Sequence, residues 1–349
     1  MPEEEKNALQ AQMLSNRLRK RDRHLRKWAR RTGIDAYRLY DRDIPEIPLT
    51  LDRYGDALAG ALYERPYEKD TRRESLWLAL IKEAISETLG IPPDSIFLKE
   101  RKRQRGKAQY EKQRSENFTR NIHEGDISFT VNLSDYLDSG LFLDRRKLRT
   151  LIRSEAEGKS VLNLFCYTAS LSVAAAKGRA LLVDSVDMSN TYLNWAARNF
   201  TLNGLRTFSL SPERLAGGPA WQKRLSEARA SAFPPCPLIR ADALRFINGA
   251  VEAGLSWDML ILDPPSFSNS KKMQETFDLK RDYWKLVSQC LKLLTPGGTL
   301  YFSVNTGNFH IDTDAFPHTL IEDIRDRLID EDFKGKKTPA CYTIRRREW

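Results

Sequence analysis

Apolar residues in the C-terminal part of the chain form short continuous runs, separated by segments of helical periodicity. The runs are too short for helices and lack the polar–apolar alternation of a strand with one solvated face. Strands that are apolar on both faces are typical of a parallel sheet covered by helices on both sides. We therefore predict a doubly wound α/β domain over residues 137–349, interrupted by an inserted, partly helical surface excursion at about 207–237. The predicted strands are SVLNLF (160–165), ALLVDSVDM (180–188), CPLIRAD (236–242), DMLILD (258–263) and TLYFSVN (299–305).

The first 136 residues follow a different pattern. Residues 1–50 are predicted to form a basic helix followed by an extended stretch, and residues 51–136 a small α+β subdomain. Within the subdomain, LTLDRYGDALAGALYE (49–64) is typical of a hairpin that turns at Gly55-Asp56. The helical segment that follows ends at Gly90, with Pro92 beyond it.

Ligands of open parallel sheets bind beyond the carboxyl ends of the strands. The first predicted strand ends in NLFCYTAS (163–170), where a nucleotide cofactor would meet a tight turn and a helix N-terminus. Four other residues stand there in place of the acid and the glycines that let a backbone approach a pyrophosphate closely, which makes the loop bulky. They are Asn163, Phe165, Tyr167 and Ala169. A cofactor without phosphates is therefore favoured over a dinucleotide.

Two acids stand at the ends of the next strands. Asp187 could accept both hydroxyls of a ribose, or it could cap the following helix together with Ser189. Asp242 could accept from an adenine amino group, or cap the helix that follows it. The sequence leaves both alternatives open at these positions.

The fourth predicted strand ends in Asp263-Pro264-Pro265. Two prolines cannot continue a central strand, but they hold the backbone rigid, so the carbonyls between Asp263 and Ser266 point outward at a fixed angle. Such a turn can hold a planar base by its edge, with Phe267 available to stack on it. The alternative is a sharp strand exit in which Phe267 is merely packed.

Composition adds a basic excess of 57 Lys and Arg over 47 Asp and Glu, a formal net charge of +10. Much of it lies in NRLRKRDRHLRKWARR (16–31) and KERKRQRGKAQYEKQR (99–114), which contain few acids. A solvated helix face is one reading of such runs, and an RNA-binding surface is the other. Aromatic residues in or near the clusters, Trp28, Tyr37, Tyr40 and Tyr110, favour nucleic acid. The predicted RNA-binding residues are Arg17, Arg19, Lys20, Arg101, Arg103, Arg105, Lys107 and Lys271.

No apolar run is long enough to span a membrane, and the N-terminus lacks the features of a signal peptide, so we expect a cytoplasmic protein without a membrane partner. The four cysteines are far apart and form no CxxC pair. They are expected to be buried thiols, with no metal site.

Together these motifs resemble the class I methyltransferases that use S-adenosylmethionine, which have a Rossmann-like, seven-stranded sheet. More narrowly, the chain resembles the C-terminal half of the bacterial bifunctional 23S ribosomal RNA guanine methyltransferases. The resemblance rests on NRLRKRDRHLRKWARRTGIDAYRLYDRDIP, LKERKRQRGKAQYEK, DYLDSGLFLDRR, NLFCYTAS, VDMSNTYLNWAARNFTLNGL, IRADAL, DPPSFSNSKKM and FDLKRDYWKL, and so covers nearly the whole chain. The chain departs from the family at Ala169, where a glycine is typical.

The resemblance implies roles for the matching positions. S-adenosylmethionine would contact Asp187 through its ribose, Asp242 through adenine, and the 163–169 loop through its amino acid end. Met188 and Ala243 would also bind the cofactor. Ser139, Phe142 and Asp144 would close over the cofactor. Asp263, Pro264, Pro265 and Phe267 would face the methyl group and the base.

The implied reaction is transfer of a methyl group to N7 of a guanine in 23S ribosomal RNA or an assembly intermediate of it. Guanine N7 has a free lone pair, so it needs positioning and no general base. Cytosine-C5 enzymes need a nucleophilic Cys after the fourth or fifth strand. This chain has DPPSF and SVNTGN there, with Asn305 at the second place. The alternatives that stay open are methylation of guanine N2 or another RNA base, and a non-catalytic RNA-binding assembly factor. The sequence does not define an oligomeric state.

Overall fold

The computed structural model describes residues 2–63, 70–101, 116–210, 223, 227, 234–268 and 277–347. The chain divides into two compact units. Unit 1 comprises residues 1–139 and 331–336, and unit 2 comprises residues 140–330 and 337–349. The first two predicted segments therefore share one unit, and that unit also takes six residues from the C-terminal part of the sequence.

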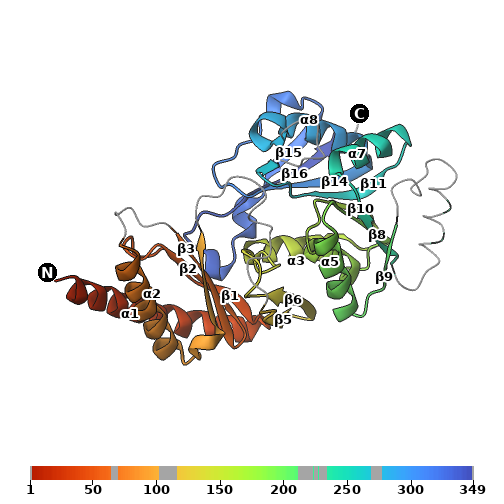
Figure 1. Cartoon of the computed structure of the whole chain (residues 1–349). Coiled ribbons are helices and arrows are strands. Elements are labelled where there is room, and N and C mark those ends of the chain that lie inside the picture. Colours follow the sequence, from red (N-terminus) through yellow and green to blue (C-terminus); the bar gives the residue numbers. More distant parts are fainter. Residues whose placement is uncertain are drawn as a thin grey trace. The chain divides into compact units, whose positions relative to one another are not determined.

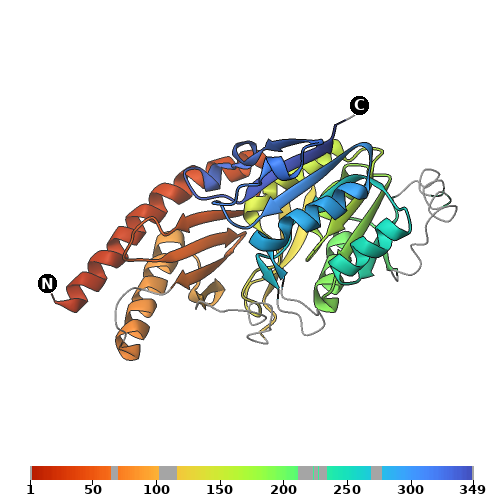
Figure 2. The same ribbon diagram turned by 90° about the horizontal axis from the view of Figure 1, so that it is seen from above.

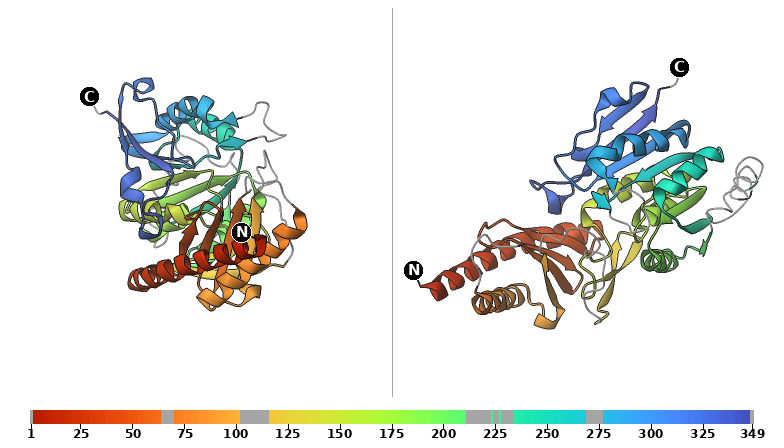
Figure 3. Two further views of the ribbon diagram at one scale, coloured as in Figure 1. Left: turned by 90° about the vertical axis from the view of Figure 1, so that its left-hand side faces the viewer. Right: turned by 45° about the horizontal axis from the view of Figure 1, so that its top comes forward.

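Unit 1 is a four-stranded sheet with two helices packed beside it and one shared apolar core (Figures 1 and 3). The sheet order is β1-β2-β3-β4, with the first three strands antiparallel and β3 parallel to β4. A separate hairpin, β5-β6, completes the unit. The elements are α1 (Glu3–Thr32), β1 (Ala36–Asp41), β2 (Leu49–Tyr54), β3 (Ala57–Tyr63), α2 (Thr71–Leu89), β4 (Ile96–Arg101), β5 (Thr119–Glu124) and β6 (Ile127–Asn132).

The local sequence signals explain these boundaries. β2 and β3 pair across Gly55, which has a φ of +62°, so the predicted hairpin is confirmed. Asp70 caps α2 by accepting from the backbone N–H of Arg72, and Gly90 ends the helix in a left-handed conformation. The buried residues of α1 recur at helical spacing and include Leu14, Leu18 and Leu25. α1 therefore buries one face against the rest of unit 1 and exposes the other.

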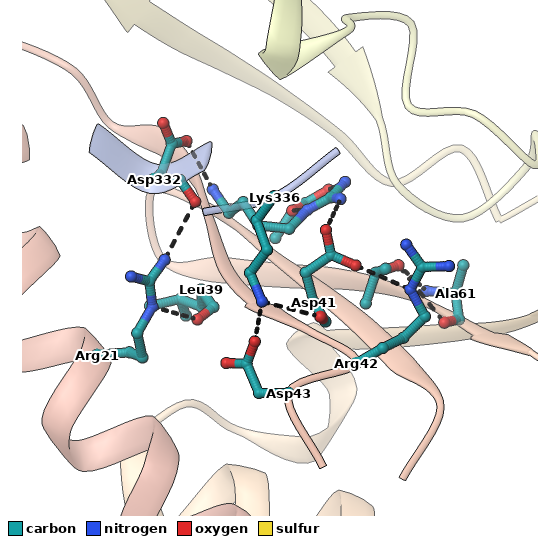
Figure 4. Close-up of polar contacts among 11 residues, drawn as sticks. Arg21, Leu39, Asp41, Arg42, Asp43, Ala61, Asp332 and Lys336 are labelled. Carbon is teal, nitrogen blue, oxygen red and sulfur yellow. Dashed lines mark hydrogen bonds and ion pairs between the residues drawn. The ribbon is translucent and has the colours of Figure 1, made fainter. Parts of the chain in front are cut away.

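The segment 331–336 is bound into unit 1 by polar contacts, several of which Figure 4 shows. The carboxylate of Asp332, which is fully buried, accepts from the backbone N–H of Arg38 at 3.0 Å. The backbone carbonyl of the same residue accepts from Arg21 at 3.1 Å. Lys336 forms an ion pair with Asp43. A short stretch of the C-terminal sequence thus fixes both β1 and α1.

Unit 2 is built on an eight-stranded sheet with the order β15-β16-β14-β11-β7-β8-β10-β9. The strands from β14 to β9 are parallel, and β16 is antiparallel to both β14 and β15. The seven-stranded sheet that the sequence predicts is present, and the eighth strand is the short edge strand β9. The strands are β7 (Ser160–Leu164), β8 (Leu182–Asp187), β9 (Thr207–Ser209), β10 (Cys236–Arg240), β11 (Trp257–Leu262), β14 (Leu294–Val304), β15 (Thr319–Asp323) and β16 (Ala340–Arg346), with a small pair β12 (Phe267–Ser268) and β13 (Phe277–Asp278) outside the sheet.

Helices cover both faces of this sheet (Figures 1 and 2). Right-handed crossovers place α4 and α5 on one face, where α3 also packs, and α7 and α8 on the other. β7 is buried along its whole length, and β8 and β11 are buried at all but one position each, which explains their largely apolar sequences. The helices are α3 (Arg146–Glu155), α4 (Ser170–Lys177), α5 (Asn190–Leu202), α7 (Ala243–Glu252) and α8 (Leu279–Lys292).

The structure also bears on the expectations for the cysteines and for membrane-spanning helices. All four cysteines are free and buried, as predicted. None of the helices in the described ranges combines the length and the apolar character that a membrane-spanning helix requires. The predicted excursion at 207–237 lies largely outside the described residues.

Candidate active site

The strand order reverses beside β7, at the carboxyl ends of the parallel strands. From β7 the chain steps to β8 and β10 in one direction, and β11 and β14 lie in the other direction. The loops after β7 and β11 therefore diverge to opposite faces, and ligands of open α/β sheets bind between such loops. The predicted site residues at the ends of β7, β8, β10 and β11 are brought to this one edge.

The loop after β7 has a strained backbone. Phe165, Tyr167 and Ala169 have φ values of +57°, +53° and +59°, a left-handed conformation that side chains other than glycine rarely adopt. Each such residue costs of the order of 1–3 kcal/mol and persists only where the surroundings fix it. Ala169, where the family resemblance implies a glycine, is left-handed with its methyl group fully buried.

Hydrogen bonds to this loop from several elements fix its shape. The Thr168 hydroxyl donates to the carbonyl of Gly140 at 2.6 Å, and the Asn199 amide donates to the carbonyl of Thr168 at 2.9 Å. Gly140 has a φ of +92°, and a Cβ added there would lie 2.1 Å from a ring carbon of Trp195. The glycine of the DSGLFL motif is therefore required for close packing beneath the loop.

Asp187 connects the ends of β7 and β8. Its carboxylate accepts from the backbone N–H of Tyr167 at 2.9 Å and from that of Ser189 at 2.8 Å. The cap of α5 is the Ser189 hydroxyl, which accepts from Tyr192. Burial raises the pKa of Asp187 to about 6, although the backbone donors of Ser189, Tyr167 and Met188 oppose this shift. Helix capping therefore does not account for this carboxylate, which holds the strained loop.

Asp242 has the capping role that the sequence left open. It is the N-cap of α7, and one carboxylate oxygen accepts from the backbone N–H of Arg245 at 3.0 Å. Ala243 behind it is buried. Two large apolar side chains near the strand ends stay exposed, Met188 at 40% and Phe142 at 38%. The Phe142 ring lies 5.3 Å from the ring of Tyr167.

Two predicted cofactor residues form hydrogen bonds within their own units. Asn163 is 1% exposed, and its amide donates to the Ser172 hydroxyl within the core. The side chain thus points from β7 toward α4 and into the core. Ser139 belongs to unit 1, where its hydroxyl lies 2.8 Å from that of Tyr54. Asp144 is partly buried, at 3.6 Å from Arg145.

Arg145, which the sequence did not single out, holds the Asp-Pro-Pro turn after β11. Its Nε and Nη2 atoms each donate to one oxygen of Asp263 at 2.9 Å. Burial lowers the pKa of Arg145, but the carboxylates of Asp263 and Asp144 outweigh that effect and raise the pKa above its ordinary value. The bidentate contact orients the carboxylate and offsets its charge.

The remaining predicted site residues are Phe267 and the basic residues assigned to RNA. The side chains of Phe267 and Arg101, and all of Arg103, Arg105, Lys107 and Lys271, lie outside the described residues. Arg17, also predicted as an RNA contact, forms an ion pair with Asp43 at 2.7 Å inside unit 1. Arg19 and Lys20 are exposed.

Comparisons with known proteins identify the family. Residues 77–216 match the S-adenosylmethionine-dependent methyltransferase family. Over 331 residues the chain is 41% identical to ribosomal RNA large subunit methyltransferase K of Neisseria meningitidis, covering 95% of this chain and 86% of that protein. The chain therefore belongs to the S-adenosylmethionine-dependent methyltransferase family of this relative. It is also 42% identical over 322 residues to ribosomal RNA large subunit methyltransferase K/L of Pseudomonas aeruginosa, covering 92% of this chain but only 40% of the relative.

Solved structures show the same fold. SMU.776 complexed with SAH superposes with a TM-score of 0.70 at 24% identity, over 96% of this chain and 81% of that one. A SAM-dependent methyltransferase from Agrobacterium tumefaciens gives a TM-score of 0.55 at 17% identity, over 90% and 91% of the two chains.

The residues of this methyltransferase fit its cofactor, S-adenosylmethionine. The Asp187 carboxylate is of the kind that accepts ribose hydroxyls, and the exposed apolar Met188 beside it suits an adenine face. The bulky loop after β7 leaves no phosphate cradle, and the cofactor has no phosphates to place there. We expect Asp187, Met188 and Asp242 to line the adenosyl end.

The pKa of Asp187 leads to a prediction about cofactor binding. Ribose hydroxyls donate to the carboxylate, so binding favours its charged form. Because the pKa is raised to about 6, lowering the pH through that value should weaken affinity by about tenfold per unit. Calorimetry at a series of pH values measures this, with Asp187→Asn as a control that cannot titrate. An equal pH dependence in Asp187→Asn would contradict the assignment.

A second prediction concerns the Arg145–Asp263 pair. Removing one partner of a buried ion pair costs about 3–5 kcal/mol, so Arg145→Met and Asp263→Leu should each lower the free energy of unfolding. The double variant should recover much of that loss, because it leaves no unpaired charge. Displacement of the turn by about 1 Å should still lower methyl transfer by about 100-fold.

Denaturant unfolding and single-turnover transfer, measured on the three variants, separate the two effects. If activity recovers together with stability in the double variant, the pair has only a structural role.

Proposed function

We propose that this methyltransferase transfers a methyl group to N7 of a guanine in 23S ribosomal RNA, or in an assembly intermediate of it, in the bacterial cytoplasm. The high identity to ribosomal RNA large subunit methyltransferase K over most of both chains supports a ribosomal RNA substrate. The net charge of +10 supports a polyanionic partner.

The proposed chemistry asks little of the protein beyond positioning. Bound S-adenosylmethionine supplies an electrophilic methyl group on a sulfonium centre. Guanine N7 attacks with a lone pair that carries no proton, so the reaction needs the two atoms in line at about 3–3.5 Å. The rigid turn at Asp263-Pro264-Pro265 supplies fixed carbonyl acceptors for the edge of the base.

The pairing of the Asp263 carboxylate with Arg145 is the observation that supports the N7 proposal most directly. Both of its carboxylate oxygens accept from Arg145 at 2.9 Å, so the acid beside the predicted base site is paired with a guanidinium. Asp187 lies on the other side of β7 from this turn and already accepts two backbone N–H groups. An attacking nitrogen that must lose a proton would find no uncommitted base among these strand-end acids.

Covalent catalysis on cytosine is poorly supported. Asn305 follows β14, where such an enzyme would carry cysteine. Cys166 follows β7, but it is buried, and burial raises the pKa of its thiol well above the ordinary value. A thiol in that state is a weak nucleophile.

Substrate analogues test the atom. Nucleoside mass spectrometry of 23S RNA from a deletion strain first locates the missing methyl group. RNA carrying 7-deazaguanosine at that position should then bind but accept no methyl group, because carbon replaces the nucleophile. RNA carrying inosine should still react, since inosine lacks only the N2 amino group.

The opposite pair of results would assign the reaction to N2 instead. Transfer of labelled methyl to neither analogue nor to guanosine, despite cofactor binding by calorimetry, would indicate a non-catalytic RNA-binding assembly factor.

A further inference from the structure

We propose that one face of α1 binds the phosphate backbone of a single RNA strand over about four successive phosphates, without reading its sequence. This inference rests on the proposed function and extends it to a defined surface of unit 1. The basic face of α1 consists of Arg19, Lys20, Arg23, Arg26, Lys27, Arg30 and Arg31, all of which are exposed.

The spacing of these residues defines one continuous stripe. Counted from Arg19 they stand at i, i+1, i+4, i+7, i+8, i+11 and i+12, so they lie on one side of the helix over about three turns. Figure 2 shows α1 as one continuous helix, so no kink divides the stripe. A rise of about 1.5 Å per residue makes the stripe about 18 Å long, with cationic groups about one helical turn, ~5.4 Å, apart. This step is comparable to that between neighbouring phosphates along a strand.

Charge compensation differs sharply between the two sides of α1. On the side facing the rest of unit 1, Arg17 pairs with Asp43 at 2.7 Å and His24 lies 2.8 Å from Glu331. Arg21, between them, donates to the backbone carbonyls of Leu39 and Asp332 (Figure 4). These cations and ring nitrogens already have partners within the unit.

On the basic face, Arg26 pairs with Asp22, an acid that also pairs with Arg53. The other six residues of the face form no ion pair with any residue in the described ranges. Like charges at i and i+4, such as Arg19 with Arg23 and Arg23 with Lys27, repel each other and destabilise the helix. A polyanion laid along the face would relieve this repulsion and release its own counterions.

The aromatic residues of unit 1 that lie near the basic face bear on whether it can recognise RNA bases. Trp28, Tyr37 and Tyr40, whose nearness to the basic clusters favoured nucleic acid, are buried in the core of unit 1 at 8%, 3% and 0% exposure. A buried ring cannot stack on a base, so these three residues give no support to that interpretation. Tyr110 lies outside the described residues. A face that offers only cations contacts phosphates and fixes position without specifying sequence.

Two matched double variants test the proposal. Arg23→Ala with Lys27→Ala removes two charges from the basic face. Arg198→Ala with Lys292→Ala removes two exposed charges from helices of unit 2, so this variant has the same net charge as the face variant. Affinity for a 23S RNA transcript and for poly(U) is measured across a range of salt concentrations, together with cofactor affinity and the Tm.

The face variant should flatten the slope of log K against log salt by about 1.4–1.8, which is 0.7–0.9 for each of two lost phosphate contacts. The loss should be alike for both RNAs, cofactor affinity should not change, and the Tm should rise. The unit 2 variant should keep the wild-type slope on both RNAs.

An unchanged slope in the face variant, while the wild-type chain still methylates 23S RNA, would overturn this inference and leave the proposed function intact. A flattened slope with no methylation of any RNA by the wild type would overturn the proposed function alone. An unchanged slope on RNA together with lost binding to polyglutamate would overturn the RNA assignment and give the face to an acidic protein.

Discussion

Neighbouring parallel strands β7 and β11 lead into helices on opposite faces of one sheet, and this divergence of their loops is the constraint on which the site depends. The order of the strands fixes which residues share that edge: the end of β8 lies on one side of β7 and the Asp-Pro-Pro turn on the other. Burial of both faces of the sheet makes this order rigid, since no strand can shift without moving the helices packed on it. Chemistry at the edge can therefore rely on fixed backbone positions.

The strained loop after β7 shows how that rigidity is used. Three left-handed residues without a glycine are unfavourable by themselves, of the order of 1–3 kcal/mol each. Asp187 from the next strand, Gly140 before α3 and Asn199 from α5 hold the loop from separate directions. A carboxylate that accepts the backbone N–H of this loop and also faces the predicted ribose would couple cofactor binding to loop geometry. The same logic applies on the other side of β7, where Arg145 holds Asp263.

Sequence reasoning anticipated the features that local pattern encodes. Apolar runs predicted the central strands, and the acids and prolines that end them predicted the residues gathered at the edge. Local pattern does not encode long-range pairing. Arg145 and Asp263 are 118 positions apart, and nothing near Arg145 in the sequence indicates its partner. The segment 331–336 joins unit 1 through contacts with β1 and α1 that no periodicity reports. Charge and aromatic content alone also failed to distinguish Arg17 from Arg19, or a buried Trp28 from an exposed one, because the face of a helix is set by what packs against it.

The pH dependence of the chemical step tests the central claim most directly. Single-turnover methyl transfer to 23S RNA, at saturating cofactor and RNA, reports the rate constant of the step itself. If the lone pair of guanine N7 attacks without a general base, that rate constant should stay flat from about pH 6.5 to about pH 9. A rate constant that rises tenfold per pH unit toward a plateau would show that a proton must leave before or during transfer, and it would contradict the account.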